Sequence, residues 1–333
     1  MHIEVILTIS YMSFNIMYTL NISIIIPVYN VSNYLKKCLE SVINQSLLDI
    51  EIIIINDCSP DPLDHEICNE YASNDKRIIY IQHKKNLGLG GARNTGLSVA
   101  KGEYVWFLDS DDFIDTNACE FLYTLAKSKN IDVVAFSATS HVDGNLCLSG
   151  RDYYYYWRDL AMLDNIYCGK EFIGLALASN SFIVSACLHL FSNKLISNYK
   201  FREHVIHEDT DLIPMVIYNA NSVYCIKYAP YYRLLREGSI TQSKVTESTL
   251  MNKFSYVESL FNYMGELDLN AKDPLLLYSL QLFHAVEHQY SEYINKTNST
   301  EVLFSSLRKI YNNSLMQITK EDIKQNVESG AYN

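Results

Sequence analysis

The chain has no excess of positive charge and no motif that pairs its cysteines, and these two absences remove several classes of protein. Its 333 residues contain 27 Lys and Arg against 38 Asp and Glu, a formal net charge of -11. Because affinity for a phosphate backbone comes from clustered Lys and Arg, this balance disfavours a nucleic-acid partner. The 8 cysteines are scattered without a C-x-x-C pair, which argues against a zinc ribbon and a disulfide scaffold. We therefore expect reduced thiols and a cytoplasmic location.

Long apolar runs are also missing. Residues 1–20 are apolar overall, but they carry Glu4 where a signal peptide has a basic flank, and they lack an A-x-A cleavage site. Neither this segment nor any other is apolar over the length of a transmembrane helix. We interpret residues 1–20 as an N-terminal extension. With 48% hydrophobic and 20% charged residues, the rest has the composition of a globular enzyme with a full core.

From residue 22 the chain alternates short β-branched runs with segments of helical period. This order is typical of βαβ units and of a largely parallel sheet. The predicted strands are 22–27, 50–55, 77–81, 103–108 and 131–136. The predicted helices are 31–45, 66–72, a segment that follows a glycine-rich turn and ends near 100, and 117–128. From about residue 246 the spacing of Leu, Phe and Tyr predicts helices alone, so we expect an α/β domain followed by a helical C-terminal region.

Polar side chains follow three of the predicted strands. Asn30, Asp57 and Asp109 each lie just beyond the carboxyl end of a strand. Open α/β sheets bind ligands at that edge. We therefore expect these three side chains to meet at one crevice.

The segment D-S-D-D at 109–112 follows a buried strand directly. Side chains at i and i+2 of an extended segment point the same way, so Asp109 and Asp111 can face one cation. Hard carboxylate oxygens suit Mg²⁺ or Mn²⁺, which keep open positions for substrate phosphates. An isolated D-x-D is more often a solvated turn, but the polar residues at the other strand ends favour a metal site here.

Four segments together resemble the bacterial family-2 glycosyltransferases, which have the GT-A fold. They are I-I-I-P-V-Y-N at 24–30, I-I-N-D-C-S at 54–59, N-L-G-L-G-G-A-R-N-T-G at 86–96 and G-E-Y-V-W-F-L-D-S-D-D at 102–112. Later echoes are Glu208-Asp209 and the segment 231–241, which carry the resemblance to about residue 245. One departure is N-D-C-S at 56–59, where the family often shows D-D-G-S. It leaves Asp57 in place.

The resemblance implies roles for individual residues. Those that would bind the donor nucleotide are Pro27, Tyr29, Asn30, Asp57, Asn86, Arg93, Asp109, Arg236 and Ser239. Asp111 and Asp109 would bind the metal ion, with Asp111 the more direct ligand. Asp209, with Glu208 beside it, would supply the catalytic base.

The resemblance also implies an activity and an organisation. The GT-A domain would cover 21–245, with a nucleotide-binding half over about 21–115, an acceptor half over about 116–245, and a helical region at 246–333. It would transfer a hexose or N-acetylhexosamine from a UDP-sugar, with inversion and with Mn²⁺ or Mg²⁺, to a glycan hydroxyl. The acceptor would be lipid-linked, in capsule or O-antigen synthesis at the cytoplasmic face of a bacterial membrane. Peripheral membrane contact and a homo-oligomer remain open.

Rival explanations stay open for single motifs and for the whole chain. Arg93 could be a surface residue of a helix, and the acidic residues 208–211 could begin a helix at the positive end of its dipole. The glycines at 88–91 resemble a dinucleotide fingerprint, but Arg93 occupies the position of its third glycine. A metal-dependent nucleotidyltransferase would need a Lys- and Gly-rich triphosphate loop near the first strand, and this sequence has none there. A catalytically silent sugar-nucleotide-binding protein is disfavoured because the four carboxylates of the resemblance are all present.

Overall fold

The computed structural model describes residues 20–142, 156–236, 246–267, 269–270 and 272–297. Within these residues the main sheet has the strand order β3-β2-β1-β4-β9-β6-β10-β8, and a small sheet has the order β5-β11-β7. The main-sheet strands are β1 Ile22–Val28, β2 Ile50–Asn56, β3 Ile78–Gln82, β4 Tyr104–Phe107, β6 Val133–Ala135, β8 Asn165–Tyr167, β9 His189–Ser192 and β10 Val223–Cys225. The small sheet consists of β5 Phe113–Ile114, β7 Ala138–Val142 and β11 Tyr231–Leu235.

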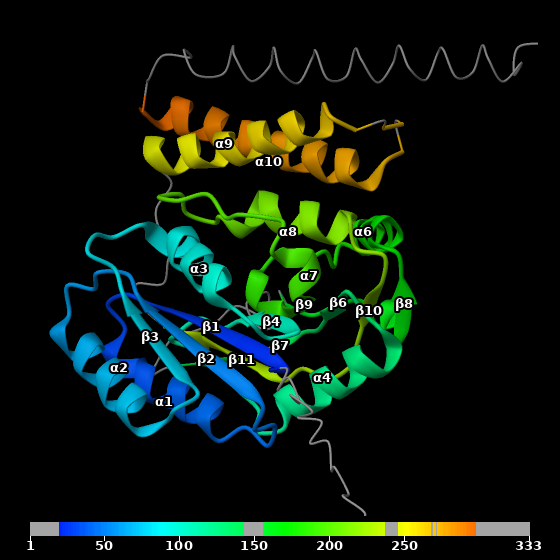
Figure 1. The fold of residues 1–333 in the computed structure, drawn as a ribbon. Helices are drawn as coiled ribbons and strands as arrows, with labels where there is room; N and C mark the ends of the chain where they lie inside the picture. The colour runs from blue at the N-terminus through cyan, green and yellow to red at the C-terminus, as the bar shows by residue number, and fades with distance from the viewer. Residues whose placement is uncertain (1–19, 143–155, 237–245, 268, 271, 298–333) are drawn as a thin grey trace, which may run out of the picture.

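Helices cover both faces of the main sheet. They are α1 Ser32–Ile43, α2 Pro62–Asn74, α3 Gly88–Val99, α4 Ala118–Lys129, α6 Gly169–Ala178, α7 Asn193–Ile196, α8 Asp209–Tyr218, α9 Glu247–Met264 and α10 Pro274–Thr297. Two 3₁₀ turns are η1 Leu160–Met162 and η2 Ala186–Leu188. Figure 1 shows α1 and α2 on one face and α3 on the other, with α9 and α10 lying together beyond α8. None of the helices described is long and apolar enough to cross a bilayer.

The predicted α/β architecture, with a mostly parallel sheet and a helical C-terminal region, is confirmed. Strands β3, β2, β1 and β4 are mutually parallel, and β1 and β2 are buried along their whole length. Strands covered on both faces need continuous apolar sequence, which is why these two consist largely of isoleucine. Strand β9, between β4 and β6, runs antiparallel to both neighbours.

Two helices begin earlier than the sequence predicted. Helix α2 starts at Pro62 because Asp61 caps it, accepting a hydrogen bond from the Leu63 N–H at 3.0 Å. An aspartate N-cap and a proline at the first helical position are both standard signals for the start of a helix. Helix α3 starts at Gly88, so the glycine run is the first turn of the helix and not a turn before it.

The glycine run lets a distant segment lie against α3. A Cβ atom on Gly90 would overlap the backbone carbonyl of Arg202, and Gly88 has φ +77°, which side chains disfavour. The His204 N–H also donates a hydrogen bond to the Leu87 carbonyl at 3.1 Å. The glycines therefore allow the chain just before Glu208 to contact the start of α3.

Replacing Gly90 by Ala tests this packing. We expect the free energy of unfolding, measured by urea denaturation, to fall by about 1–3 kcal/mol, the usual cost of overpacking. The matched control is Gly174→Ala in α6, where the nearest atom is the Pro274 Cβ, 3.8 Å away. This control is expected to be neutral or stabilising, because Ala favours a helix interior. Equal effects of the two substitutions would contradict the explanation.

Candidate active site

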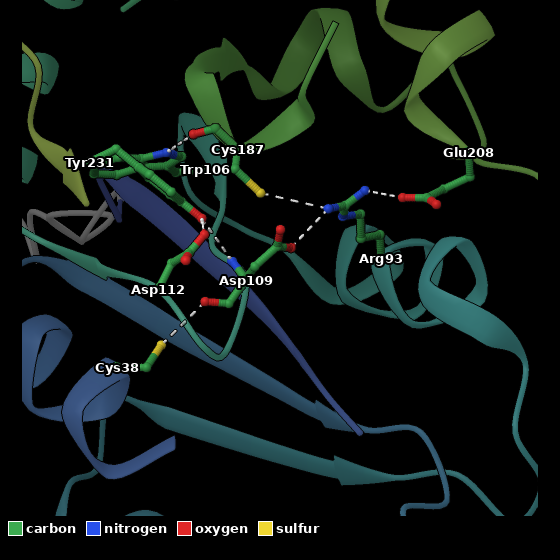
Figure 2. Close-up of polar contacts among 8 residues, drawn as sticks. All are labelled: Cys38, Arg93, Trp106, Asp109, Asp112, Cys187, Glu208 and Tyr231. Carbon is green, nitrogen blue, oxygen red and sulfur yellow. Dashed lines mark hydrogen bonds and ion pairs between the residues drawn. The ribbon is translucent and has the colours of Figure 1, made fainter. Parts of the chain in front are cut away.

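The acidic turn after β4 is anchored to strand β11. The Tyr231 hydroxyl donates to Asp112 Oδ2 at 2.6 Å, and the Leu234 N–H donates to Asp112 Oδ1 at 2.7 Å. The Asp109 N–H donates to the Tyr231 hydroxyl at 3.4 Å, as Figure 2 shows. Burial, reinforced by Asp111 and Asp109, raises the pKa of Asp112 well above its usual range. Asp112 therefore holds the acidic turn against strand β11. The sequence did not reveal this role.

Asp111 lies beside Arg236 at the end of β11. The Arg236 Nε donates to Asp111 Oδ2 at 2.8 Å, and its guanidinium lies 5.1 Å from the ring centroid of Tyr34. Burial raises the pKa of Asp111, and the charge of Asp109 raises it further, while Arg236 opposes both. Ser239 lies outside the described residues.

The donor set of this turn fits a divalent cation that keeps part of its coordination open. Asp109 Oδ2 and Asp111 Oδ1 form no hydrogen bond with any residue that the structure describes. Within the described ranges no group of three or more His, Cys, Asp or Glu side chains forms a complete metal cage. Two carboxylates are what Mg²⁺ typically takes from a protein when substrate phosphates and water complete its shell.

Arg93 joins three segments that are far apart in the sequence. Its Nη1 donates to Glu208 Oε1, and its Nη2 donates to Asp109 Oδ1 at 3.0 Å and to Cys187 Sγ at 3.6 Å (Figure 2). The side chain is only 2% exposed, so Arg93 is not a surface residue of α3. The guanidinium is also 5.4 Å from the ring centroid of Phe201. This arrangement links α3, the end of β4 and the residue before α8.

Neighbouring carboxylates stabilise the positive charge of Arg93. Burial opposes this charge, but the carboxylates of Glu208 and Asp109 outweigh burial and raise the pKa of Arg93. The Arg93 guanidinium therefore has two carboxylate partners within the protein, and Arg93 lies between the two acidic segments.

Glu208 and Asp209 differ in what they can reach. Glu208 is buried against Arg93, and burial raises its pKa to about 7 although Arg93 pulls in the opposite direction. Asp209 is half-buried, and burial raises its pKa too, opposed by Arg93 and His207. Asp209 is also the first residue of α8, as the alternative of a helix start predicted, and this position is compatible with a chemical role. Of the two carboxylates, Asp209 is the less buried.

The C-terminal helices brace the start of α8. The Tyr278 hydroxyl of α10 donates to the Thr210 carbonyl at 2.9 Å. Arg202 pairs with Asp211 at 2.9 Å and donates to Ser255 of α9 at 2.7 Å. The position of Asp209 thus depends on α9 and α10 as well as on the sheet.

Asp57, at the end of β2, is held by the segment after β3. Its Oδ1 accepts hydrogen bonds from His83 Nδ1 at 2.6 Å and from the Leu87 N–H at 2.8 Å. The Asn86 amide donates to the Asp57 carbonyl at 3.1 Å. The structure therefore brings Asp57 and Asn86 together, and it adds His83, which the sequence analysis missed.

The end of β1 is the most open part of the site. Pro27 pairs in register with Ile55 of β2, and Tyr29 beyond it is 50% exposed. Asn30 has φ +52°, and its N–H donates to Ser59 Oγ at 3.0 Å. This bond ties the turn after β1 to the turn that carries Asp57.

Residues 23–198, more than half of the chain, match the model of the family described as Glycosyl transferase family 2. The chain belongs to this family. The match covers the first three strands, the glycine run and the acidic turn, and it ends before Glu208.

Two relatives are described as a glycosyltransferase and as a teichoic acid biosynthesis protein. The chain is similar to Glycosyltransferase GlyA of Streptococcus pneumoniae serotype 4, with 34% identity over 226 residues, 66% of this chain and 31% of the relative. It is similar to the Minor teichoic acid biosynthesis protein GgaB of Bacillus subtilis, with 29% identity over 295 residues, 82% of this chain and 31% of the relative. The chain thus spans about a third of the length of each of these relatives.

A solved structure shows the same fold. S. aureus TarS 1–349, in complex with UDP-GlcNAc, matches with a TM-score of 0.60 and 20% sequence identity, over 90% of this chain and 80% of that chain. The predicted GT-A fold of this family-2 chain is confirmed by this match.

Removing Arg93 from the site tests its part in holding the acidic segments. We expect Arg93→Met to lower the free energy of unfolding by about 3–5 kcal/mol, because it strands buried Glu208 without its partner. Adding Glu208→Gln is expected to recover part of this loss, since the stranded charge disappears. Chemical denaturation of the two single variants and the double variant measures the coupling.

The control for this cycle is Lys127→Met, which breaks an exposed ion pair with Glu103. Exposed pairs contribute little, so this variant should unfold like the wild type. Strictly additive effects of Arg93→Met and Glu208→Gln would show that the pair is not coupled.

Proposed function

We propose that this chain is an inverting glycosyltransferase that moves a sugar from a UDP-sugar to a hydroxyl of a glycan acceptor. The observation that carries the proposal is the linkage of the acidic turn at Asp109 to Glu208-Asp209 through Arg93. It joins a candidate metal and diphosphate site to a candidate base within one cluster. The TarS complex with UDP-GlcNAc supports a UDP-sugar donor of the hexose or N-acetylhexosamine type.

The relatives support a place in bacterial surface polysaccharide synthesis. GgaB is described as a teichoic acid biosynthesis protein, and two further relatives are chondroitin synthases. We propose a lipid-linked acceptor of the capsule or O-antigen kind, reached at the cytoplasmic face of the membrane. We further propose 21–245 as the transferase domain, with a nucleotide-binding half to about 115, and 246–333 as its helical support.

Different residues would carry out different parts of the sugar transfer. Asp57 and Asn86 would bind the nucleoside, and Asp109 and Asp111 would hold Mn²⁺ or Mg²⁺. The ion, when bound, supplies positive charge against the departing diphosphate. Asp209 would take the proton from the acceptor hydroxyl as that oxygen attacks the anomeric carbon. A single displacement of this kind inverts the anomeric centre.

Release of UDP from a panel of UDP-sugars tests the proposal. We expect one donor to give UDP release that EDTA abolishes, and Asp111→Asn to lower the rate about 100-fold or more, because it weakens the charge stabilisation of the leaving group. The control is Asp49→Asn, an exposed carboxylate before β2 at the opposite end of the strands. It should retain the wild-type rate.

The other outcomes of this assay favour other classes. Release of pyrophosphate from a nucleoside triphosphate would favour a nucleotidyltransferase. Silence across the panel, together with no binding of any UDP-sugar, would contradict the proposed function. Binding of a donor without turnover, in the presence of metal and a range of acceptors, would favour a catalytically silent protein.

The pH dependence of transfer tests the assignment of Asp209. Burial raises the pKa of Asp209, so its carboxyl stays protonated to a higher pH than a free Asp, whose pKa is about 3.9. A base acts only when deprotonated, so kcat should rise with pH through an apparent pKa above that value. Because Glu208 lies beside it, the measured value belongs to the pair.

The matching variant is Asp209→Asn. We expect it to bind the donor normally and to lose the rising limb along with most turnover, about 100-fold or more. Unchanged turnover with an unchanged pH profile would remove Asp209 from the role of base.

A further inference from the structure

His83 is fixed at both ends of its ring. It is the first residue after β3, and its N–H donates to the Asn56 carbonyl at 2.9 Å. Its Nδ1 lies 2.6 Å from Asp57 Oδ1, and its Nε2 lies 2.9 Å from the hydroxyl of Thr95 in α3. The side chains of His83 and Asp57 are only 10% and 4% exposed. The imidazole is therefore a buried link between the end of β2 and α3.

The contacts of Asp57 are one-sided. His83 and the Leu87 N–H both donate to Oδ1, and no hydrogen bond from the described part of the chain reaches Oδ2. An ionised carboxylate only accepts, so the His83 Nδ1 must carry the proton of the short bond. These two donors turn the carboxylate into one orientation and leave Oδ2 as its remaining acceptor.

We propose that His83 is a positioning residue that makes Asp57 a selective acceptor for the donor's nucleobase. The inference rests on the proposed function, in which Asp57 binds the nucleoside. A fixed carboxylate oxygen accepts a hydrogen bond from the N3–H of uracil. In cytosine N3 is itself an acceptor, so the same oxygen repels that base. His83 thus acts through Asp57 on the choice between uracil and cytosine.

The second ring nitrogen of His83, Nε2, contacts helix α3 through Thr95. With its proton on Nδ1, the neutral ring accepts the Thr95 hydroxyl at Nε2, and Thr95 Oγ1 also lies 3.1 Å from the Gly91 carbonyl, one turn earlier in α3. Helix α3 also carries Arg93. The ring orients Asp57 against a helix that is itself held by the Arg93 ion pairs, so a change in its anchor should affect base recognition.

Binding of UDP and CDP to the folded full chain, in the presence of Mn²⁺ and measured by isothermal titration calorimetry, tests the inference. His83→Phe keeps a ring but removes both nitrogen contacts. We expect its Kd for UDP to rise about 10-fold or more, the equivalent of one hydrogen bond to a charged group, while its Kd for CDP changes little. The ratio of the two Kd values should therefore collapse, and kcat at saturating donor should stay within about twofold.

Three further variants separate positioning from general support. His83→Gln, which can still donate to Asp57, should recover part of the preference for UDP. His65→Phe is the matched control, because His65 is exposed on α2 and, among the residues that the structure describes, its ring bonds the Tyr80 hydroxyl alone. Thr95→Val removes the far anchor and should weaken UDP several-fold without weakening CDP. Thr95→Val decides the question if His83→Phe does not fold.

The outcomes separate this inference from the function on which it rests. A folded His83→Phe with the wild-type Kd for UDP and the wild-type ratio overturns the inference alone. An equal loss of UDP and CDP binding also overturns it, because that result describes general support of the fold. A wild type that binds neither nucleotide overturns the proposed function.

Discussion

The site depends on one buried cation. Arg93 is almost wholly removed from water, and a charge in that position is tolerated only when carboxylates compensate it. Glu208 and Asp109 do so from opposite sides, one from the segment before α8 and the other from the end of β4. Glu208 is buried too and would be costly to leave without its partner, whereas Asp109 is 36% exposed. Arg93 and Glu208 therefore require one another, and through Asp109 the guanidinium also links the two acidic segments.

The packing of the segment 201–204 against α3 also helps to bring Glu208 close to Arg93. The segment 201–204 can contact α3 only because glycine occupies positions 88 and 90. Without that contact the chain leading to Glu208 would lie farther from Arg93. The glycines that resemble a dinucleotide fingerprint in the sequence thus act by permitting two backbones to meet. They allow the segment before Glu208 to lie against α3, as Tyr231 holds the acidic turn against β11.

The three carboxylates of the acidic turn have separate duties. Asp112 is buried and bonds Tyr231 and the backbone of β11 with both of its oxygens, so its role is to hold the turn. Asp109 gives one oxygen to Arg93, and Asp111 gives one to Arg236. Crowded negative charge raises the pKa of Asp111 beyond the effect of burial. A divalent cation would relieve that crowding, which is the physical reason that the turn suits one.

Local pattern was enough to predict the strands and the candidate residues, but not their partners. Runs of isoleucine identify β1 and β2, because strands covered on both faces must be apolar throughout. The motif residues Asp57, Asp109 and Glu208 were named as candidates from sequence, whereas His83 was not, and Tyr231 was noted only as part of the segment 231–241, without a role. Their roles come from contacts across 26 and 119 positions, which local pattern does not predict. Strand β9 was missed for the same reason, because its place between β4 and β6 depends on tertiary contacts and not on local sequence.

The helical C-terminal region is better regarded as part of the site than as an appendage. The family match ends at residue 198, ten residues before Glu208, so the shared core does not itself contain the candidate base. Helix α8 begins with Asp209 and is held from outside by Tyr278 and Ser255, and Tyr218 at its other end donates to Asp273 at 2.7 Å. A helix start that is pinned by two further helices cannot shift independently of them. The change near residue 245 is therefore a change in secondary structure, and the placement of the candidate base depends on residues from both sides of it.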